Sequence, residues 1–586
     1  MNVGTALRSG VRVLLDRPSS VLPVYLFVAG ITATTRVPVV LGLAAVVGIL
    51  AADGRLDALF TELQGLDPET LDESSPETAA DSIAPGLEEA VVDVFSPEIL
   101  VVGIGAILVT VIVSVFANGI GNTAAINGIY GCLYGGDGVE DAVVGVGRDW
   151  KAFVGITLVK IGVLLVGSIP VVLGASLFVV SPIAGAAATF VGFLLSTGVV
   201  IVGLLLLAFA GQSIVVDGSN LGGAIRRSAG FLFGNPIAFL AYVIVALAVF
   251  GVLAVLGGIF RFLEISQLSG ILGPLFVLPF LDAFKTALYA DRPLATRLDD
   301  HASPSAGTPA TDSRTEMTDG GERPPSDDQP SDVPQPSVDE QATVDAEQSE
   351  NADDQSMDDE RTAGGEPAVG AADRAGDGAD RSKDDQPAYR HRFIGAFRDG
   401  LVALGGFTRY NPVPILGAAV LFVAAAVGGW QLTAEYAVDL PAGSQPGEVF
   451  GAFPVAVFVT IAANNWLVSA TAIFGGVALG VPTAVDMLLN GVIVGAVSGI
   501  ADPLVVLALV APHGVIELPA IIIAGGFGFH LAAVVAGMFR GTRTSTDLAE
   551  ALRLAYRVLL GLAVVLVVAS FVEAFVTPMV AEAVLG

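Results

Sequence analysis

Long runs of apolar residues dominate the chain, and they are too continuous for the half-buried strands or amphipathic helices of a water-soluble core. A run of 18 or more apolar residues can cross a bilayer as a helix. Each run is expected to be helical, because backbone groups in hydrocarbon must bond within the segment. We predict six spans before a polar central segment and five after it, at 21–52, 99–119, 152–180, 183–214, 236–260, 270–290, 411–434, 453–480, 488–510, 513–537 and 557–579.

This pattern predicts an all-α, polytopic integral membrane protein with about eleven transmembrane helices in two bundles. Residues 1–296 are expected to form a six-span domain with an acidic loop at 53–98, and residues 391–586 a five-span domain. The segment 297–390 is rich in Asp, Glu, Ser, Pro and Gly. It can bury too little apolar surface to offset its ordering entropy, so we expect a disordered acidic linker.

Composition and charge agree with this division. The 586 residues are 53% hydrophobic with a mean hydropathy of +0.73, yet the net charge is −30. Residues 53–98 contribute −12 and residues 298–389 contribute −19, so the remaining chain is close to neutral. The sequence has only four lysines, and Asp is abundant. This balance indicates a halophile, in which concentrated salt screens acidic repulsion.

Basic residues predict the orientation of the spans. With eleven spans, clusters of Arg and Lys all fall on one side, which the positive-inside rule makes cytoplasmic. The protein is therefore expected in the cell membrane, with its N-terminus and the 297–390 linker in the cytoplasm and loop 53–98 and the C-terminus outside. Arg36 interrupts the first span and has no predicted partner, while Lys160 is expected to mark the inner edge of the third. The clusters are Arg8/Arg12/Arg17, Arg148/Lys151, Arg226/Arg227, Arg292/Arg297, Arg390/Arg392/Arg398/Arg409 and Arg540/Arg543/Arg553/Arg557.

A local pattern precedes three of the spans: an arginine-bearing segment followed by Pro18, Pro236 or Pro412. Proline suits the first turn of a helix, where its missing N–H would be unpaired in any case. We interpret each copy as an interfacial amphipathic helix that leads into a span.

Several functional classes are excluded. A single cysteine, Cys132, allows no internal disulfide framework and no multi-cysteine metal site. The bases lie singly or in small groups at helix ends, so no nucleic-acid surface is predicted. The chain has no H-E-x-x-H, G-x-S-x-G or phosphate-binding loop with Lys. We therefore predict no catalytic residue, no cofactor and no metal.

Four motifs follow one another in the second half. They are NNW at 464–466, NGVIVGAVSG at 490–499, PHGVIELPAIIIAGG at 512–526 and FVEAFVTP at 571–578. Over about 411–580 the chain resembles the stage II sporulation protein M family, and the PHG-x-x-E-L run is its most specific signature. The resemblance implies a multi-span protein that assembles with partner proteins, in sporulating bacteria with cell-wall hydrolases. On the stretch from AIRRS to GNP (224–236), the first half resembles an uncharacterised six-helix membrane domain of salt-loving archaea.

Small residues recur at helical spacing in the second half. Gly491, Gly495 and Gly499 are four apart and line one helix face, which lets another backbone approach closely. Gly525 and Gly526 are further candidates for helix packing. Packing within the domain and an interface with another subunit, including a second copy of the chain, are both open.

Ionisable and amide side chains within the spans are the candidate functional residues, because such groups are costly in hydrocarbon. His513 and Glu517 are four apart and share a helix face. We expect Glu573 on the last span to lie at a similar depth and Asp502 on the ninth span slightly deeper, all in the outer half of the bundle. The amide candidates are Asn464, Asn465 and Asn490.

Three interpretations of this group stay open: polar contacts that hold helices together, an ion or proton pathway, and a metal-assisted enzyme. Zinc sites usually need three protein ligands, and His530 faces away from Glu517 on the predicted helix. The leading functional hypothesis is a non-enzymatic assembly or scaffold component for envelope proteins. The alternative is a permease or channel component for a small solute or ion that uses the outer carboxylates.

Overall fold

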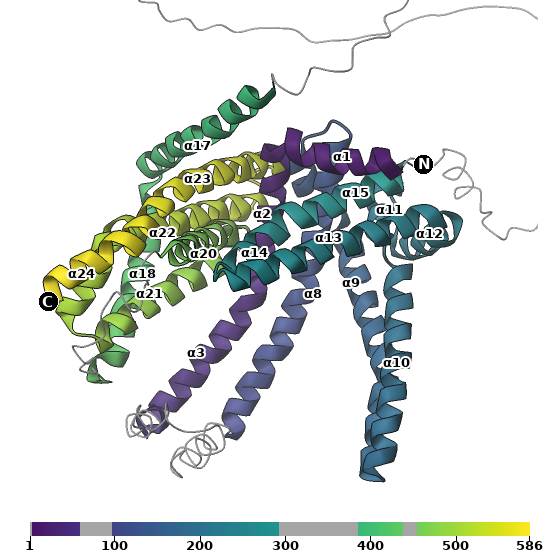
Figure 1. The fold of residues 1–586 in the computed structure, drawn as a ribbon, viewed down its shortest axis with the longest axis horizontal. Helices are drawn as coiled ribbons and strands as arrows, with labels where there is room; N and C mark the ends of the chain where they lie inside the picture. The colour runs from purple at the N-terminus through teal and green to yellow at the C-terminus, as the bar shows by residue number, and fades with distance from the viewer. Residues whose placement is uncertain (1–2, 59–95, 292–384, 437–453, 586) are drawn as a thin grey trace, which may run out of the picture. The chain divides into compact units, whose positions relative to one another are not determined.

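The computed structural model describes residues 3–58, 96–291, 385–436 and 454–585, and side chains are described in all of these except 385–393 and 436. The described parts are helical (Figure 1), and eleven helical segments are long and apolar enough to cross a membrane. This confirms the predicted fold class. The segments are Pro18–Ala52, Pro97–Leu133, Gly138–Val179, Pro182–Asp217, Pro236–Phe262, Gln267–Ala290, Pro412–Thr433, Val455–Ala478, Val481–Ile500, Pro503–Phe539 and Ser545–Leu585.

Several spans consist of more than one helix. The first half contains α1 (Val3–Asp16), α2 (Pro18–Ala33), η1 (Thr34–Arg36), α3 (Val37–Ala52), α8 (Pro97–Leu133), α9 (Gly138–Ser176), η2 (Leu177–Val179), α10 (Pro182–Leu206), α11 (Ala210–Asp217), α12 (Leu221–Gly234), α13 (Pro236–Phe262), α14 (Gln267–Leu272), η3 (Gly273–Val277) and α15 (Leu278–Ala290). The second half contains α17 (Asp385–Tyr410), α18 (Pro412–Thr433), η4 (Ala434–Tyr436), α20 (Val455–Phe474), η5 (Gly475–Ala478), α21 (Val481–Ile500), α22 (Pro503–Phe539), α23 (Ser545–Phe571), η6 (Val572–Val576) and α24 (Thr577–Leu585).

The three proline patterns produce the same local geometry. At each of them a helix (α1, α12 or α17) ends, one junction residue follows, and a proline then starts the next helix. The junction residues Arg17, Asn235 and Asn411 have φ/ψ values of −130°/45°, −135°/57° and −127°/57°. Proline disfavours helical geometry in the preceding residue, which explains why these three residues leave it.

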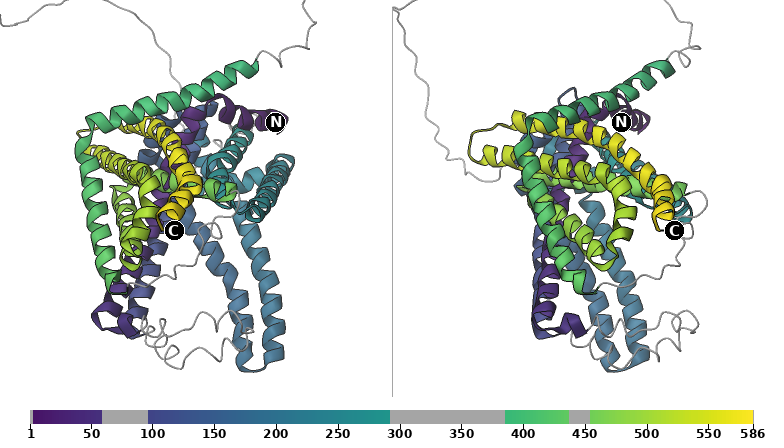
Figure 2. Two further views of the ribbon diagram at one scale, coloured as in Figure 1. Left: turned by 60° about the vertical axis from the view of Figure 1, so that its left-hand side comes forward. Right: turned by 90° about the vertical axis from the view of Figure 1, so that its left-hand side faces the viewer.

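The long pair α9 and α10 lies side by side (Figure 1 and Figure 2), because small residues let the two backbones approach. Gly192 of α10 faces the backbone of Pro170, and Gly174 of α9 faces the backbone of Ala188. Elsewhere α10 is hardly covered by the chain, since its buried residues are Gly185 and Gly192.

In the second half, α21 packs against α18 along its glycine face. A β-carbon added to Gly495 would meet the backbone of Ala426, and one added to Gly491 would meet the carbonyl of Phe422. Gly499 lies equally close to Thr433, whose hydroxyl donates to the carbonyl of Ala496 at 2.8 Å. The four-residue glycine spacing therefore forms a helix–helix contact within the chain.

Residues 1–298 and 386–586 belong to one compact unit. Gly30 of α2 lies directly against the backbone of Phe474, where α20 passes into η5. The Thr460 hydroxyl of α20 donates to the carbonyl of Glu264 at 2.8 Å. The two sets of spans therefore contact each other through side chains and backbone.

The boundary between the ninth and tenth spans differs from our prediction. We placed it near 511–512, but α21 ends at Ile500 and α22 begins at Pro503, so Pro512 lies inside a helix of 37 residues. The Asp502 side chain accepts a hydrogen bond from the Leu504 amide at 2.7 Å and caps α22. An N-cap aspartate followed by proline starts a helix strongly, and membrane helices tolerate an internal proline.

Two further predictions concern segments that the structure leaves largely undescribed. Most of loop 53–98 and nearly all of linker 297–390 lie outside the described residues. The external position of the loop and the disorder of the linker therefore stay predictions, as does the division into two domains at the linker.

Candidate functional site

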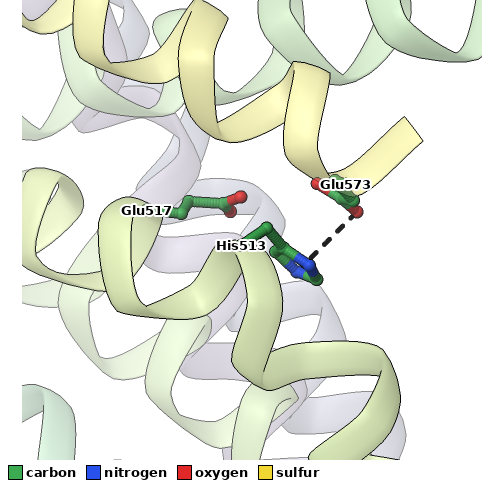
Figure 3. Close-up of side chains that lie close together, drawn as sticks. All are labelled: His513, Glu517 and Glu573. Carbon is green, nitrogen blue, oxygen red and sulfur yellow. Dashed lines mark ion pairs between the residues drawn. The ribbon is translucent and has the colours of Figure 1, made fainter. Parts of the chain in front are cut away.

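The candidate site combines an imidazole and two carboxyls from two helical segments. α22 supplies His513 and Glu517 one turn apart, and Glu573 comes from η6. One possible ligand atom from each side chain lies within 4.8 Å of the other two. Figure 3 shows the side chains of His513 and Glu573 facing each other, with the Glu517 carboxyl beside them.

Glu573 is positioned by a π-helix, Val572–Val576, inside the last span. Single π-helical turns within α-helices are rare and are frequently found at functional sites. His513 Nε2 lies 4.0 Å from Glu573 Oε1, and His513 Nδ1 lies 3.4 Å from the Thr577 hydroxyl. Thr577 also donates to the carbonyl of Val572 at 3.2 Å. The π-helical turn thus presents both a carboxyl and a hydroxyl to the same imidazole.

Glu517 lies on the more buried side of the site. Its Oε2 atom is buried and has no hydrogen-bond partner among the described residues, and the same is true of Asn465 Nδ2. Asn465 of α20 and Glu573 both approach the Glu517 carboxyl. Asn465 is 6% exposed, and its Oδ1 accepts from Asn464 Nδ2 at 3.4 Å. The site is therefore lined by three separate spans.

The other predicted site residues lie elsewhere. Asp502 caps α22, and Asn490 donates to the backbone carbonyl of Asp486 at 2.8 Å. Gly525 faces the Met487 side chain, and Gly526 faces Ile415. These residues contribute to helix starts and helix packing rather than to the cluster.

The arrangement can bind a cation or share a proton. Two carboxyls this close in a medium of low dielectric repel each other strongly when both are ionised. A charge in hydrocarbon is stable only when it is paired and hydrogen-bonded. The His513 imidazole, a bound cation or a retained proton can each supply the compensating positive charge.

A second buried polar group, in the first half, was not predicted. The Tyr25 hydroxyl of α2 donates to Asp282 Oδ2 at 2.7 Å, and Asp282 attracts both Lys285 and Lys160. Lys285 Nζ lies 5.5 Å from the ring centroid of Phe209. The sequence signal was an acid and a base three residues apart within an apolar run, which places them on one helix face. Lys160, predicted at the inner edge of its span, faces this group.

Arg36 also has a neighbour that the sequence did not reveal. It lies close enough to the Asp486 carboxyl of α21 for the two charges to interact. This electrostatic attraction acts between the helix junction in the first span and the second half.

Helical architecture, eleven apolar segments and ionisable groups held between them define a multi-pass membrane protein. Residues 418–578 match the family model described as Stage II sporulation protein M. Over 133 residues the chain is 29% identical to an uncharacterized protein of Methanocaldococcus jannaschii, a match that covers 21% of this chain and 72% of that protein. No solved structure matches the chain.

Proposed function

We propose that the protein is a non-enzymatic assembly component that holds envelope proteins together at the cell membrane. The match of residues 418–578 to the stage II sporulation protein M family carries this proposal. The resemblance to that family implies association with partner proteins. The site residues then act chiefly by fixing α20, α22 and the last span relative to one another.

The uncovered surface of the first half is compatible with this role. α10 buries little within the chain, and Phe190, Phe193 and Leu194 are 64%, 58% and 56% exposed. In a membrane such a surface is covered either by lipid or by helices of another protein. Helix association in lipid depends on close packing and polar contacts rather than on the hydrophobic effect, so only a complementary partner would displace lipid.

Affinity purification of the full chain in a mild detergent tests the proposal. We expect one or more envelope proteins to co-purify in a fixed ratio. The control is the same tag on another multi-pass protein from the same cells. Recovery of the chain alone, after cross-linking in intact membranes has also given no product, would contradict an assembly role.

A permease or channel component is the second candidate, and the cluster of His513, Glu517 and Glu573 favours it. Ionisable groups inside membrane spans commonly mark ion or proton pathways. Proteoliposomes that contain the full chain should then show ion or solute flux, which Glu517→Gln and Glu573→Gln abolish. Asp502→Asn is the matched control, because it removes a carboxylate from the same helix while Asn keeps the cap.

A further inference from the structure

We propose that His513, Glu517 and Glu573 form a binding site for one divalent transition-metal cation of the zinc type. The three side chains provide one imidazole nitrogen and two carboxylate oxygens within 4.8 Å of one another. They come from α22 and η6, so the metal would connect the tenth span to the last one (Figure 3). The inference is independent of the assembly role proposed above.

The Thr577 hydroxyl selects the tautomer of His513. Thr577 Oγ1 donates its proton to the carbonyl of Val572, so it can only accept from His513 Nδ1. With the proton on Nδ1, Nε2 presents a lone pair toward Glu573 Oε1, 4.0 Å away. A neutral imidazole that donates from one nitrogen and presents the other is the form that binds metals. A lone pair that faces a carboxylate oxygen repels it, and a metal cation between the two removes this repulsion.

The spacing of the three ligand atoms is close to that of a metal site. In tetrahedral zinc sites with bonds of about 2.0–2.2 Å, ligand atoms lie roughly 3.3–3.5 Å apart. The corresponding separations here are at most 4.8 Å. The difference is at most about 1.5 Å, and rotation of the two flexible glutamate side chains to other staggered rotamers can supply it. The backbones of α22 and η6 therefore bring the three side chains within reach of one cation.

Unpaired buried atoms next to the cluster provide an independent indication of a ligand. Glu517 Oε2 and Asn465 Nδ2 are buried and have no hydrogen-bond partner among the described residues. Asn465 is 6% exposed and approaches Glu517. Such atoms are rare in folded proteins and indicate an unseen ligand or water. A cation would satisfy the Glu517 carboxylate, and a water bound to that cation could accept a hydrogen bond from Asn465 Nδ2.

The types of ligand favour a transition metal over calcium or magnesium. Calcium takes six to eight oxygen ligands, and magnesium keeps most of its waters. An imidazole with two carboxylates suits zinc, and three protein ligands leave a fourth position for water. Two carboxylates and one divalent cation are together electrically neutral, as a site inside a membrane requires.

Metal binding by the full chain in lipid nanodiscs tests the proposal. After chelator treatment, removal of the chelator and equilibration with zinc chloride, we expect one zinc per chain by mass spectrometry of the metal. Glu517→Gln and Glu573→Gln should each weaken binding at least about tenfold. Asp502→Asn and His530→Gln are the controls for a carboxylate and an imidazole outside the cluster, and both should bind as the wild type does. Less than a stoichiometric amount of zinc on the folded wild-type chain would overturn the proposal.

A cysteine variant distinguishes ligation from a general loss of folding. His513→Cys keeps a zinc ligand but replaces nitrogen with sulfur, so the folded variant should still bind metal. With cobalt chloride in place of zinc, it should show a thiolate-to-cobalt charge-transfer absorption that the wild type lacks. The native Cys132 is buried on α8 and cannot provide this signal. Absence of the band in a variant that elutes as a folded protein would also contradict the assignment.

Discussion

Arg553 of α23 forms an ion pair with Asp137, the residue that caps α9. The Asp137 side chain also accepts a hydrogen bond from the Val139 amide at 3.1 Å, so one carboxylate both starts a helix in the first half and binds the second half. A further contact between the halves lies nearby, where the Thr546 hydroxyl donates to Glu140 at 3.0 Å. The turn between α8 and α9 is therefore tied to the beginning of α23.

Substitutions at this pair should separate its two roles. Arg553→Gln and Asp137→Asn should each lower the free energy of unfolding by about 0.2–1 kcal/mol, because the pair is partly exposed. Asp137→Ala should cost a further 0.5–2 kcal/mol or so, because alanine also removes the cap while asparagine keeps it. Thermal unfolding in detergent measures these differences. High salt should reduce the loss that comes from breaking the ion pair and leave the loss that comes from removing the cap. Equal losses of stability for Asp137→Asn and Asp137→Ala would contradict the capping role.

The same pair predicts an acid dependence of stability. The hydrogen bond from Arg553 and its charge hold the pKa of Asp137 below its ordinary value of 3.8. The folded state therefore binds this proton less readily than the unfolded state does. The stabilisation is complete above pH 3.8 and is lost as the pH falls through the lower, folded-state pKa. In unfolding experiments at decreasing pH, the free energy of unfolding of the wild type should fall toward that of Asp137→Asn. A difference in stability between the two proteins that grows in acid would refute a stabilising role for the ionised Asp137 carboxylate.

The contact between α18 and α21 should depend on the absence of a side chain at Gly495. An alanine there would push its β-carbon into the Ala426 backbone, so Gly495→Ala should destabilise the chain by about 1–3 kcal/mol. Gly428→Ala is the matched control on α18, because nothing lies within 4 Å of an added β-carbon there. It should be neutral or stabilising by up to about 1 kcal/mol. Thermal unfolding followed by size-exclusion chromatography measures the stability of both variants. Equal stabilities of Gly495→Ala and Gly428→Ala would show that the close approach of α18 and α21 at Gly495 does not contribute to stability.

The apolar pattern was sufficient to predict the eleven spans, because span length and backbone satisfaction in lipid constrain every such segment in the same way. The same pattern misplaced the start of α22, because Asp502 and Pro503 lie within a continuous apolar run. The helix starts there because Asp502 caps it and Pro503 suits its first turn, although the run itself shows no break. Helical spacing placed His513 and Glu517 on one face. Neither the π-helical turn that carries Glu573 nor the proximity of Arg36 to Asp486 could be predicted, because both depend on how separate spans pack.

The buried group around Asp282 should be sensitive to loss of a single hydroxyl. Tyr25 is 3% exposed and donates to Asp282 at 2.7 Å. Tyr25→Phe keeps the ring but leaves a buried acceptor unpaired, so we expect a loss of about 1–3 kcal/mol in the free energy of unfolding. Tyr410→Phe is the control, because Tyr410 is 73% exposed and its change should stay within about 0.5 kcal/mol. A Tyr25→Phe protein as stable as the wild type would show that Lys285 and Lys160 alone satisfy the carboxyl.

Reporter tags should define the direction in which the chain crosses the membrane. Five predicted spans separate the central linker from the C-terminus, so tags near Asp339 and after Gly586 should report opposite compartments, with the first in the cytoplasm. A tag at Gly541, in the turn between α22 and α23, should share the compartment of the Asp339 tag, because Arg540 and Arg543 lie there. A tag at Gly135 should report the cytoplasm as well, since its neighbour Asp137 pairs with Arg553 on the helix that follows the Gly541 turn. If Gly135 and Gly541 report different sides, either the positive-inside threading or this ion pair must be wrong, and the unfolding experiments on Arg553→Gln would decide which.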